Sequence, residues 1–135
     1  MICELLGDHA AYEGGAGLIT VDPEGLAVSL FGAEPAASVL VAEAPGEPDV
    51  VAGIAMWSFS PAGRGGIWLE NLFVRPAYRR NGLGRALLTT LRGRTTGRVE
   101  WDVALGNPQA DAFYRSLGAL PVDGWRRFRW EPRHP

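Results

Sequence analysis

Lysine is absent from this chain of 135 residues, and all thirteen basic residues are arginine. Cysteine occurs once, at Cys3, which excludes an internal disulfide and argues against a cysteine-based metal site. The only two histidines, His9 and His134, lie near opposite ends of the chain. A zinc site or a Cys–His nucleophilic pair is therefore not expected, and we predict no metal.

Long hydrophobic runs are lacking as well. No apolar stretch approaches the roughly 18 residues of a membrane span, and the first ten residues contain Glu4 and Asp8 rather than the basic-then-apolar order of a signal peptide. The hydrophobic content is 47%, enough for a core in one globular domain. The sequence predicts a single domain over residues 1–135, without membrane contact and cytoplasmic by default.

Charges of opposite sign are segregated along the chain. The nine acidic residues that precede Arg64 are accompanied by no basic residue, whereas from Arg64 onward thirteen arginines outnumber six acids. Either the basic portion faces a polyanion or both portions are solvated faces. Nucleic acid is not an expected partner, because no aromatic stacking surface is interleaved with the arginines.

Periodicity and turn signals predict helices alternating with strands, a mixed α/β fold. Asp22-Pro23 and Asn107-Pro108 each pair an N-cap residue with a proline at the first helical position, and Gly32 and Gly118 mark helix ends. The expected helices cover Ile2–Tyr12, Pro23–Phe31, Leu83–Arg94 and Asn107–Gly118. The expected strands cover Ser38–Ala42, Val50–Phe59, Ile67–Val74, Val99–Ala104, Leu120–Val122 and Trp125–Trp130.

The stretch from Leu69 to Leu91 is a strand, a glycine-rich turn and a helix in succession. The turn contains the spacing R-x-x-G-x-G, from Arg79 to Gly84. Glycines let the backbone approach a ligand, and the first turn of a helix presents unpaired N–H groups at its positive end. This pattern favours a phosphate cradle, although a tight structural turn with solvated arginines has the same sequence signature. Leu87 excludes the dinucleotide fingerprint, which requires glycine there, and Arg85 excludes a Walker loop, which requires lysine.

The R-x-x-G-x-G spacing resembles the acetyl-CoA-binding signature of the GCN5-related N-acetyltransferases (GNAT). The second half of the chain strengthens the resemblance, since a strand is followed there by Asn107 at a helix start and by Tyr114 on that helix. The match to the diamine acetyltransferase branch covers about residues 50–130. It includes Leu69-Glu70-Asn71-Leu72, Arg79 to Leu88, Trp101, Asn107, Phe113-Tyr114, Leu117-Gly118-Ala119 and Trp125-Arg126.

This resemblance implies a mixed, mostly antiparallel sheet flanked by helices, with acetyl-CoA as the cofactor. The implied activity is direct acetyl transfer to a small cationic amine: a polyamine, a diamine or a thialysine-like amino acid. Backbone N–H groups near Leu72 and Phe73 would bond the acetyl oxygen and the pantetheine arm. The implied cofactor-binding residues are Leu72, Phe73, Val74, Arg79, Arg80, Asn81, Gly82, Leu83, Gly84, Arg85, Asn107 and Tyr114.

The same resemblance assigns catalytic roles to Tyr114 and Glu70. A phenol with a pKa near 10 can protonate a thiolate whose parent thiol has a pKa of about 8.5, the role implied for Tyr114; as an alternative, this tyrosine is a core aromatic beside Phe113. Glu70 would accept the amine's proton through a water or hold a cationic substrate, unless it is an outward-facing edge charge. Asn107 would bond the pantetheine arm, cap its helix, or do both.

The chain departs from the family pattern in two places. Polyamine-acetylating members carry an acidic pair on the central strand, and here Asn71, an expected substrate-binding residue beside Glu70, replaces the second acid. The loss of charge weakens the hold on a long polycation, so a smaller amine is equally expected. The chain also starts inside what would be the family's first helix, so the opening strand has no counterpart, either because the start is truncated or because the sheet does without it. A missing strand leaves a sheet edge for a partner subunit to cover, and we expect a homodimer. A non-catalytic acyl-CoA-binding module of the same fold is the alternative function.

Overall fold

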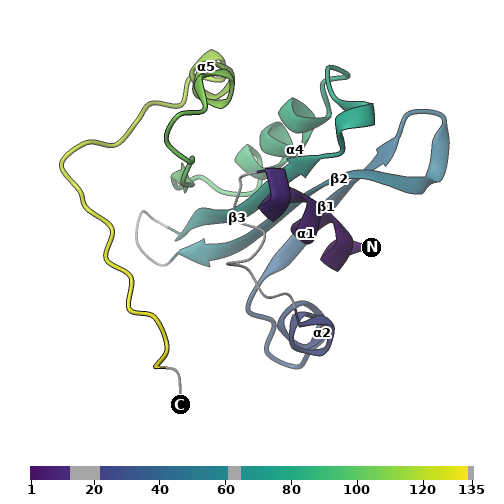
Figure 1. The fold of residues 1–135 in the computed structure, drawn as a ribbon, viewed down its shortest axis with the longest axis horizontal. Coiled ribbons are helices and arrows are strands. Elements are labelled where there is room, and N and C mark those ends of the chain that lie inside the picture. Colours follow the sequence, from purple (N-terminus) through teal and green to yellow (C-terminus); the bar gives the residue numbers. More distant parts are fainter. Residues whose placement is uncertain (13–21, 61–64, 134–135) are drawn as a thin grey trace. The chain divides into compact units, whose positions relative to one another are not determined.

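The structure is a computed structural model that describes residues 1–12, 22–60 and 65–133. These residues fall into two compact units, Met1–Ala104 and Leu105–Pro135. Figure 1 shows the elements of both units along the chain. Within the described ranges, no helix is long and apolar enough to cross a membrane.

Two helices open the first unit, as the sequence predicts. Helix α1 spans Ile2–Tyr12 and helix α2 spans Pro23–Phe31. The side chain of Asp22 caps α2, because its Oδ1 accepts the N–H of Glu24 at 3.1 Å. Pro23 occupies the first helical position, where its missing N–H costs nothing, and the helix ends before Gly32.

A four-stranded sheet follows, in the order β1-β2-β3-β4. Its strands are β1 (Ser38–Ala44), β2 (Glu47–Ser60), β3 (Gly66–Val74) and β4 (Val99–Glu100). The first two pairings are antiparallel, whereas β3 and β4 are parallel. A parallel connection needs a crossover, which helix α4 (Leu83–Arg92) supplies. The predicted mixed, mostly antiparallel sheet flanked by helices is confirmed.

Both faces of the sheet are buried against helices. On one face, Ile54 of β2 lies opposite Phe73 of β3, and both pack with Leu5 and Leu6 of α1. Helix α4 packs against the first three strands and is drawn in Figure 1 on the side of the sheet away from α1. Its buried residues are Leu87, Leu88 and Leu91. Burial of each leucine contributes about 1.5–3 kcal/mol, so the apolar stripe of α4 holds the glycine-rich turn before it against the sheet.

Several predicted boundaries shift. The strands expected over Ser38–Ala42 and Val50–Phe59 extend to Ala44 and back to Glu47, which leaves Pro45-Gly46 as the turn between them, with Gly46 at a φ of 75°. Helix α4 ends at Arg92 instead of Arg94, followed by Gly93. Strand β4 stops at Glu100 instead of Ala104, since its pairing with β3 covers only two positions.

The second unit contains one helix among its described residues, α5 (Pro108–Ser116). The strands predicted over Leu120–Val122 and Trp125–Trp130 are wrong, because residues 119–123 and 125–133 form neither helix nor strand. A strand is stabilised by hydrogen bonds to a neighbouring strand, and the described part of this unit offers none. The large apolar side chains of the segment are exposed: Leu120, Val122, Trp125, Phe128 and Trp130.

Candidate functional site

A β-bulge interrupts the pairing of β2 with β3. Asn71 pairs with Met56 and Leu69 pairs with Trp57, so Glu70 is an extra residue on β3. Leu69 is buried, whereas Glu70 is exposed. The bulge explains how a carboxylate lies within an apolar strand without the cost of burial. Bulges are frequent beside active sites, where they re-aim a side chain, so Glu70 is a candidate site residue.

Beyond the bulge, two contacts with β2 show in which direction the backbone N–H groups of β3 point. The N–H of Arg75 donates to the carbonyl of Ala52 at 2.8 Å, and Phe73 pairs with Ile54 two positions earlier. Because backbone groups alternate in direction along a strand, the N–H of Phe73 points to β2. The N–H groups of Leu72 and Val74 therefore point to the opposite edge of β3.

That opposite edge is open over the same residues. The parallel ladder with β4 consists of Ile67 opposite Val99 and Trp68 opposite Glu100. From Leu69 onward, β3 has no strand partner on this side among the described residues. Bulges generally increase the local twist of a strand, and the pairing with β4 ends two residues before the bulge at Glu70. An unpaired strand edge can bind an extended chain through its backbone groups.

The turn after β3 leads directly into a helix N-terminus. It passes through the 3-10 helix η1 (Pro76–Tyr78) and two left-handed residues, Arg80 with φ 67° and Gly82 with φ 75°. Gly82 is the N-cap of α4, and no side chain caps that end. The first N–H groups of a helix have no intrahelical partner and lie at its positive end. Together with the exposed side chains of Arg80 and Arg85, this end of α4 suits an anion such as a diphosphate.

Arg79, the first residue of the motif, is directed back toward β3. Its Nε donates to the carbonyl of Val74 at 2.8 Å, and its guanidinium carbon lies 5.4 Å from the centroid of the Phe73 ring. Asn81 also braces the turn, because its Nδ2 donates to the carbonyl of Tyr78 at 3.3 Å. The motif thus contains residues that shape the turn as well as residues that face solvent.

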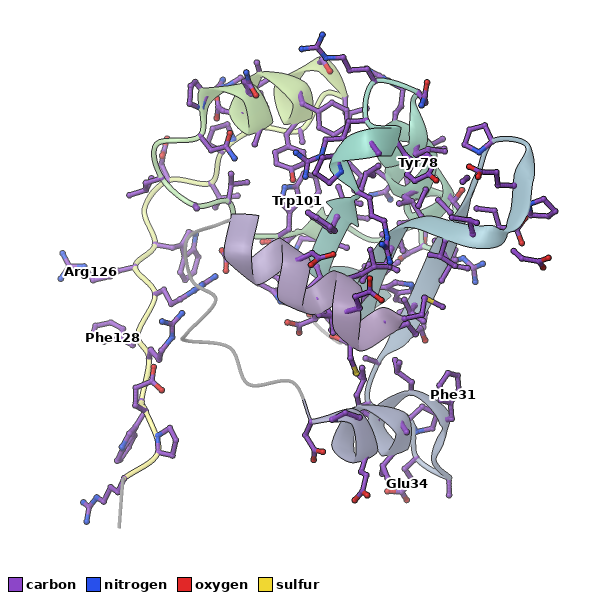
Figure 2. All side chains as sticks on the ribbon, turned by 45° about the vertical axis from the view of Figure 1, so that its right-hand side comes forward. Phe31, Glu34, Tyr78, Trp101, Arg126 and Phe128 are labelled. Carbon is purple, nitrogen blue, oxygen red and sulfur yellow. The ribbon has the colours of Figure 1, made fainter. Side chains whose placement is uncertain are left out.

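Two contacts distant in sequence tether the turn to the rest of the unit. Arg75 forms an ion pair with Glu4 of α1 at 3.2 Å. The hydroxyl of Tyr78, labelled in Figure 2, donates to Glu47 at the start of β2 at 3.1 Å. This hydrogen bond to a carboxylate raises the pKa of Tyr78 above its usual value. Sequence reasoning missed both contacts, because no local pattern links residues 71 and 31 positions apart.

In the second unit, Asn107 and Tyr114 occupy the two ends of α5. The Oδ1 of Asn107 accepts the N–H of Ala110 at 3.2 Å, which shows that Asn107 caps the helix. Tyr114 is half-buried, and its ring lies 5.4 Å from that of Phe113 at an interplanar angle of 50°. The first unit therefore carries Glu70, Asn71 and the open edge on one strand and the glycine-rich turn directly after it. Asn107 and Tyr114 belong to the second unit. Among the described residues, no three His, Cys, Asp or Glu side chains gather into a metal-binding group.

Comparison with known proteins decides the family. Residues 15–119 match the Acetyltransferase (GNAT) family. The chain belongs to this family. The acetyltransferase is 32% identical to thialysine N-epsilon-acetyltransferase of Bos taurus, over 96% of this chain and 85% of the relative. It is also 40% identical to an L-ornithine N5-acetyltransferase of Arabidopsis thaliana, over 47% of this chain and 30% of that relative.

Solved structures share the fold of the acetyltransferase. An integron cassette protein from the mobile metagenome of V. cholerae superimposes with a TM-score of 0.72 at 27% identity, covering 96% of this chain and 86% of that one. AAC(6')-Iy, solved with the bisubstrate analog CoA-S-monomethyl-acetylneamine, gives a TM-score of 0.58 at 19% identity, covering 80% of this chain and 88% of that one. The predicted family and the predicted class of enzyme, an N-acetyltransferase, are confirmed.

Proposed function

We propose that this acetyltransferase transfers an acetyl group from acetyl-CoA directly to the amine of a small cationic substrate. One observation carries the proposal: β3 is open along one edge from the bulge at Glu70 to Val74, and the turn after Val74 leads into the uncapped N-terminus of α4 at Gly82. Residues 70 and 74 are about 13 Å apart along a strand. An extended ligand with a diphosphate at one end fits this geometry, with its far end beside Glu70.

The residues present suit coenzyme A. In the proposed complex, the N–H groups of residues 82–85 and the side chains of Arg80 and Arg85 hold the diphosphate. The N–H groups of Leu72 and Val74, which face the open edge, bond the pantetheine arm and the acetyl oxygen, in place of the amide expected from Phe73. Acetyl-CoA supplies the activated acyl group as a thioester.

Transfer requires a neutral amine, a polarised carbonyl and a proton for the departing sulfur. We assign removal of the amine's proton to Glu70, acting through a water, or electrostatic anchoring of the ammonium form. Asn71 offers the substrate an uncharged hydrogen-bonding group beside that carboxylate. The N–H of Leu72 polarises the carbonyl. Tyr114 donates the proton to sulfur, and the Nδ2 of Asn107, which its helix cap does not use, contacts the cofactor.

We also propose that residues 1–135 form a single acetyltransferase domain. The family match over residues 15–119 crosses the boundary between the two units at Ala104, which supports one acetyltransferase domain. β1 is an edge strand of the described sheet, and we propose that a second copy of the chain covers this edge in a homodimer.

An amine panel tests the function: spermidine, putrescine, ornithine, thialysine and a peptide N-terminus, each assayed for release of coenzyme A. The names of the thialysine and ornithine acetyltransferases among the relatives support amino-acid substrates, and the single carboxylate at Glu70 disfavours long polycations. We expect turnover with thialysine or ornithine above that with spermidine. Binding of coenzyme A without turnover on any amine would instead favour the acyl-CoA-binding module.

A further inference from the structure

The side chain of Arg79 is directed at β3 and contacts two of its residues, Val74 and Phe73. Its Nε is bonded to the Val74 carbonyl at 2.8 Å, in a partly buried position. Its guanidinium carbon is 5.4 Å from the centroid of the Phe73 ring. Phe73 is 4% exposed and packs with Leu5, Leu6 and Ile54, so the ring is a fixed platform. Arg79 is thus held at two points of β3.

We propose that Arg79 is a positioning residue, which fixes the diphosphate turn relative to the open edge of β3. The inference rests on the proposed binding of coenzyme A. The Arg79–Val74 hydrogen bond joins two residues five positions apart in the sequence, with η1 between them. The left-handed residues Arg80 and Gly82 follow directly in the chain. The Arg79–Val74 hydrogen bond therefore fixes the direction in which the chain leaves β3, and with it the orientation of the anion-binding N–H groups.

The same hydrogen bond limits the open edge. The carbonyl of Val74 points away from β2, to the side where an extended ligand pairs with β3. Because Arg79 already donates to it, the edge offers such a ligand the N–H groups of Leu72 and Val74 and the carbonyl of Leu72. Arg79 therefore marks the end of the β3 edge that is open to a ligand and the start of the turn. In the proposed complex, the pantetheine arm lies along that edge and the diphosphate lies at the turn.

Three substitutions distinguish positioning from a direct charge contact. In Arg79→Gln, the Nε2 of glutamine lies as many bonds from the backbone as the Nε of arginine, so the donor to Val74 is kept without the charge. In Arg79→Lys, the charge is kept, but the chain carries a methylene at the position of that donor. In Arg79→Met, both are lost. Arg94→Gln, on an exposed arginine after α4, is the matched control.

Titration calorimetry with coenzyme A gives the first measurement. We expect Arg79→Gln to bind within about threefold of wild type, and Arg79→Lys and Arg79→Met to bind roughly tenfold or more weakly, the effect of one lost hydrogen bond and a displaced turn. At saturating acetyl-CoA, kcat should stay within about threefold in every variant, because a positioning defect upstream of the acyl group acts on binding. Salt dependence of the dissociation constant should be unchanged in Arg79→Gln and weaker in Arg85→Gln, where a charge facing the phosphates is lost.

The opposite pattern would overturn the inference: Arg79→Lys binding like wild type, while Arg79→Gln loses affinity and salt dependence. A ligand-free measurement separates this failure from failure of the proposed function. ¹⁵N relaxation of the amides of Arg80, Asn81 and Gly82 should show greater mobility in Arg79→Met than in wild type or Arg79→Gln. Equal mobility in all three would refute positioning, whereas a wild-type protein that ignores coenzyme A would refute the proposed site.

Discussion

Replacing Gly82 with alanine adds one methyl group at the centre of the proposed diphosphate site. Gly82 has a φ of 75°, and a Cβ built on it meets no atom of the described residues within 4 Å. The substitution therefore causes no clash with that part of the chain. Its cost to folding is the strain of a left-handed alanine, about 1–2 kcal/mol.

The cost to binding is larger if an anion approaches the backbone here. A methyl group between the phosphate oxygens and the first N–H groups of α4 removes one or two charge-assisted hydrogen bonds, each contributing about 1.5–3 kcal/mol. The dissociation constant of coenzyme A should then rise by roughly 10- to 150-fold for the loss of one such bond. The open space around Gly82 is thus predicted to be space that the ligand fills.

Gly65 is the matched control, because its φ is 74°, a Cβ there also meets no atom within 4 Å in the part of the chain that the structure describes, and it precedes β3 at the end far from the turn. Urea denaturation should show similar destabilisation, about 1–2 kcal/mol, for Gly82→Ala and Gly65→Ala. Calorimetry should show weaker binding of coenzyme A only in Gly82→Ala. Equal affinities in the two variants would refute the placement of the diphosphate at this turn.

Four further substitutions test other parts of the account. Tyr114→Phe should lower kcat by about 10²- to 10⁴-fold in steady-state assays while calorimetry shows coenzyme A affinity almost unchanged, as expected for loss of a general acid. In Glu70→Gln, a lowered kcat with an unchanged KM for the amine would indicate a base, and a raised KM with an unchanged kcat would indicate an anchor; if neither parameter changes, both roles are refuted. Glu47→Gln should lower the raised pKa of Tyr78 toward about 10 in a phenolate absorbance titration, and the stability advantage of wild type, present below pH ~10, should shrink as pH rises through the raised pKa. Leu91→Ala, at a side chain with 0% exposure, should cost about 2–5 kcal/mol in urea denaturation, and a smaller loss would contradict its place in the core.

Local signals in the sequence predicted most of the first unit and the helix of the second. Asp22-Pro23 and Asn107-Pro108 start helices, because capping and the restricted φ of proline act within a few residues. The apolar stripe of α4 is buried as its spacing predicts, with Leu87, Leu88 and Leu91 against the sheet. These features need no knowledge of the rest of the chain.

Features that depend on pairing between distant segments were not predictable in the same way. The bulge at Glu70 follows from the register of β3 against β2, which no single strand determines. The direction of Arg79 follows from a carbonyl that the register turns toward the open edge. The segment Trp125–Trp130, with its exposed aromatic residues, has the composition of a strand. The described part of its unit, however, contains no strand to pair with it. β-propensity therefore predicted a structure that the available partners do not support.

Amide hydrogen exchange with and without coenzyme A tests the central claim most directly, since it reports on individual backbone N–H groups. We predict that the cofactor slows exchange at Leu72, Val74 and residues 82–85, while the amide of Phe73, already directed at β2, changes little. Binding of coenzyme A that leaves the Leu72 and Val74 amides and the first turn of α4 unprotected would contradict the account.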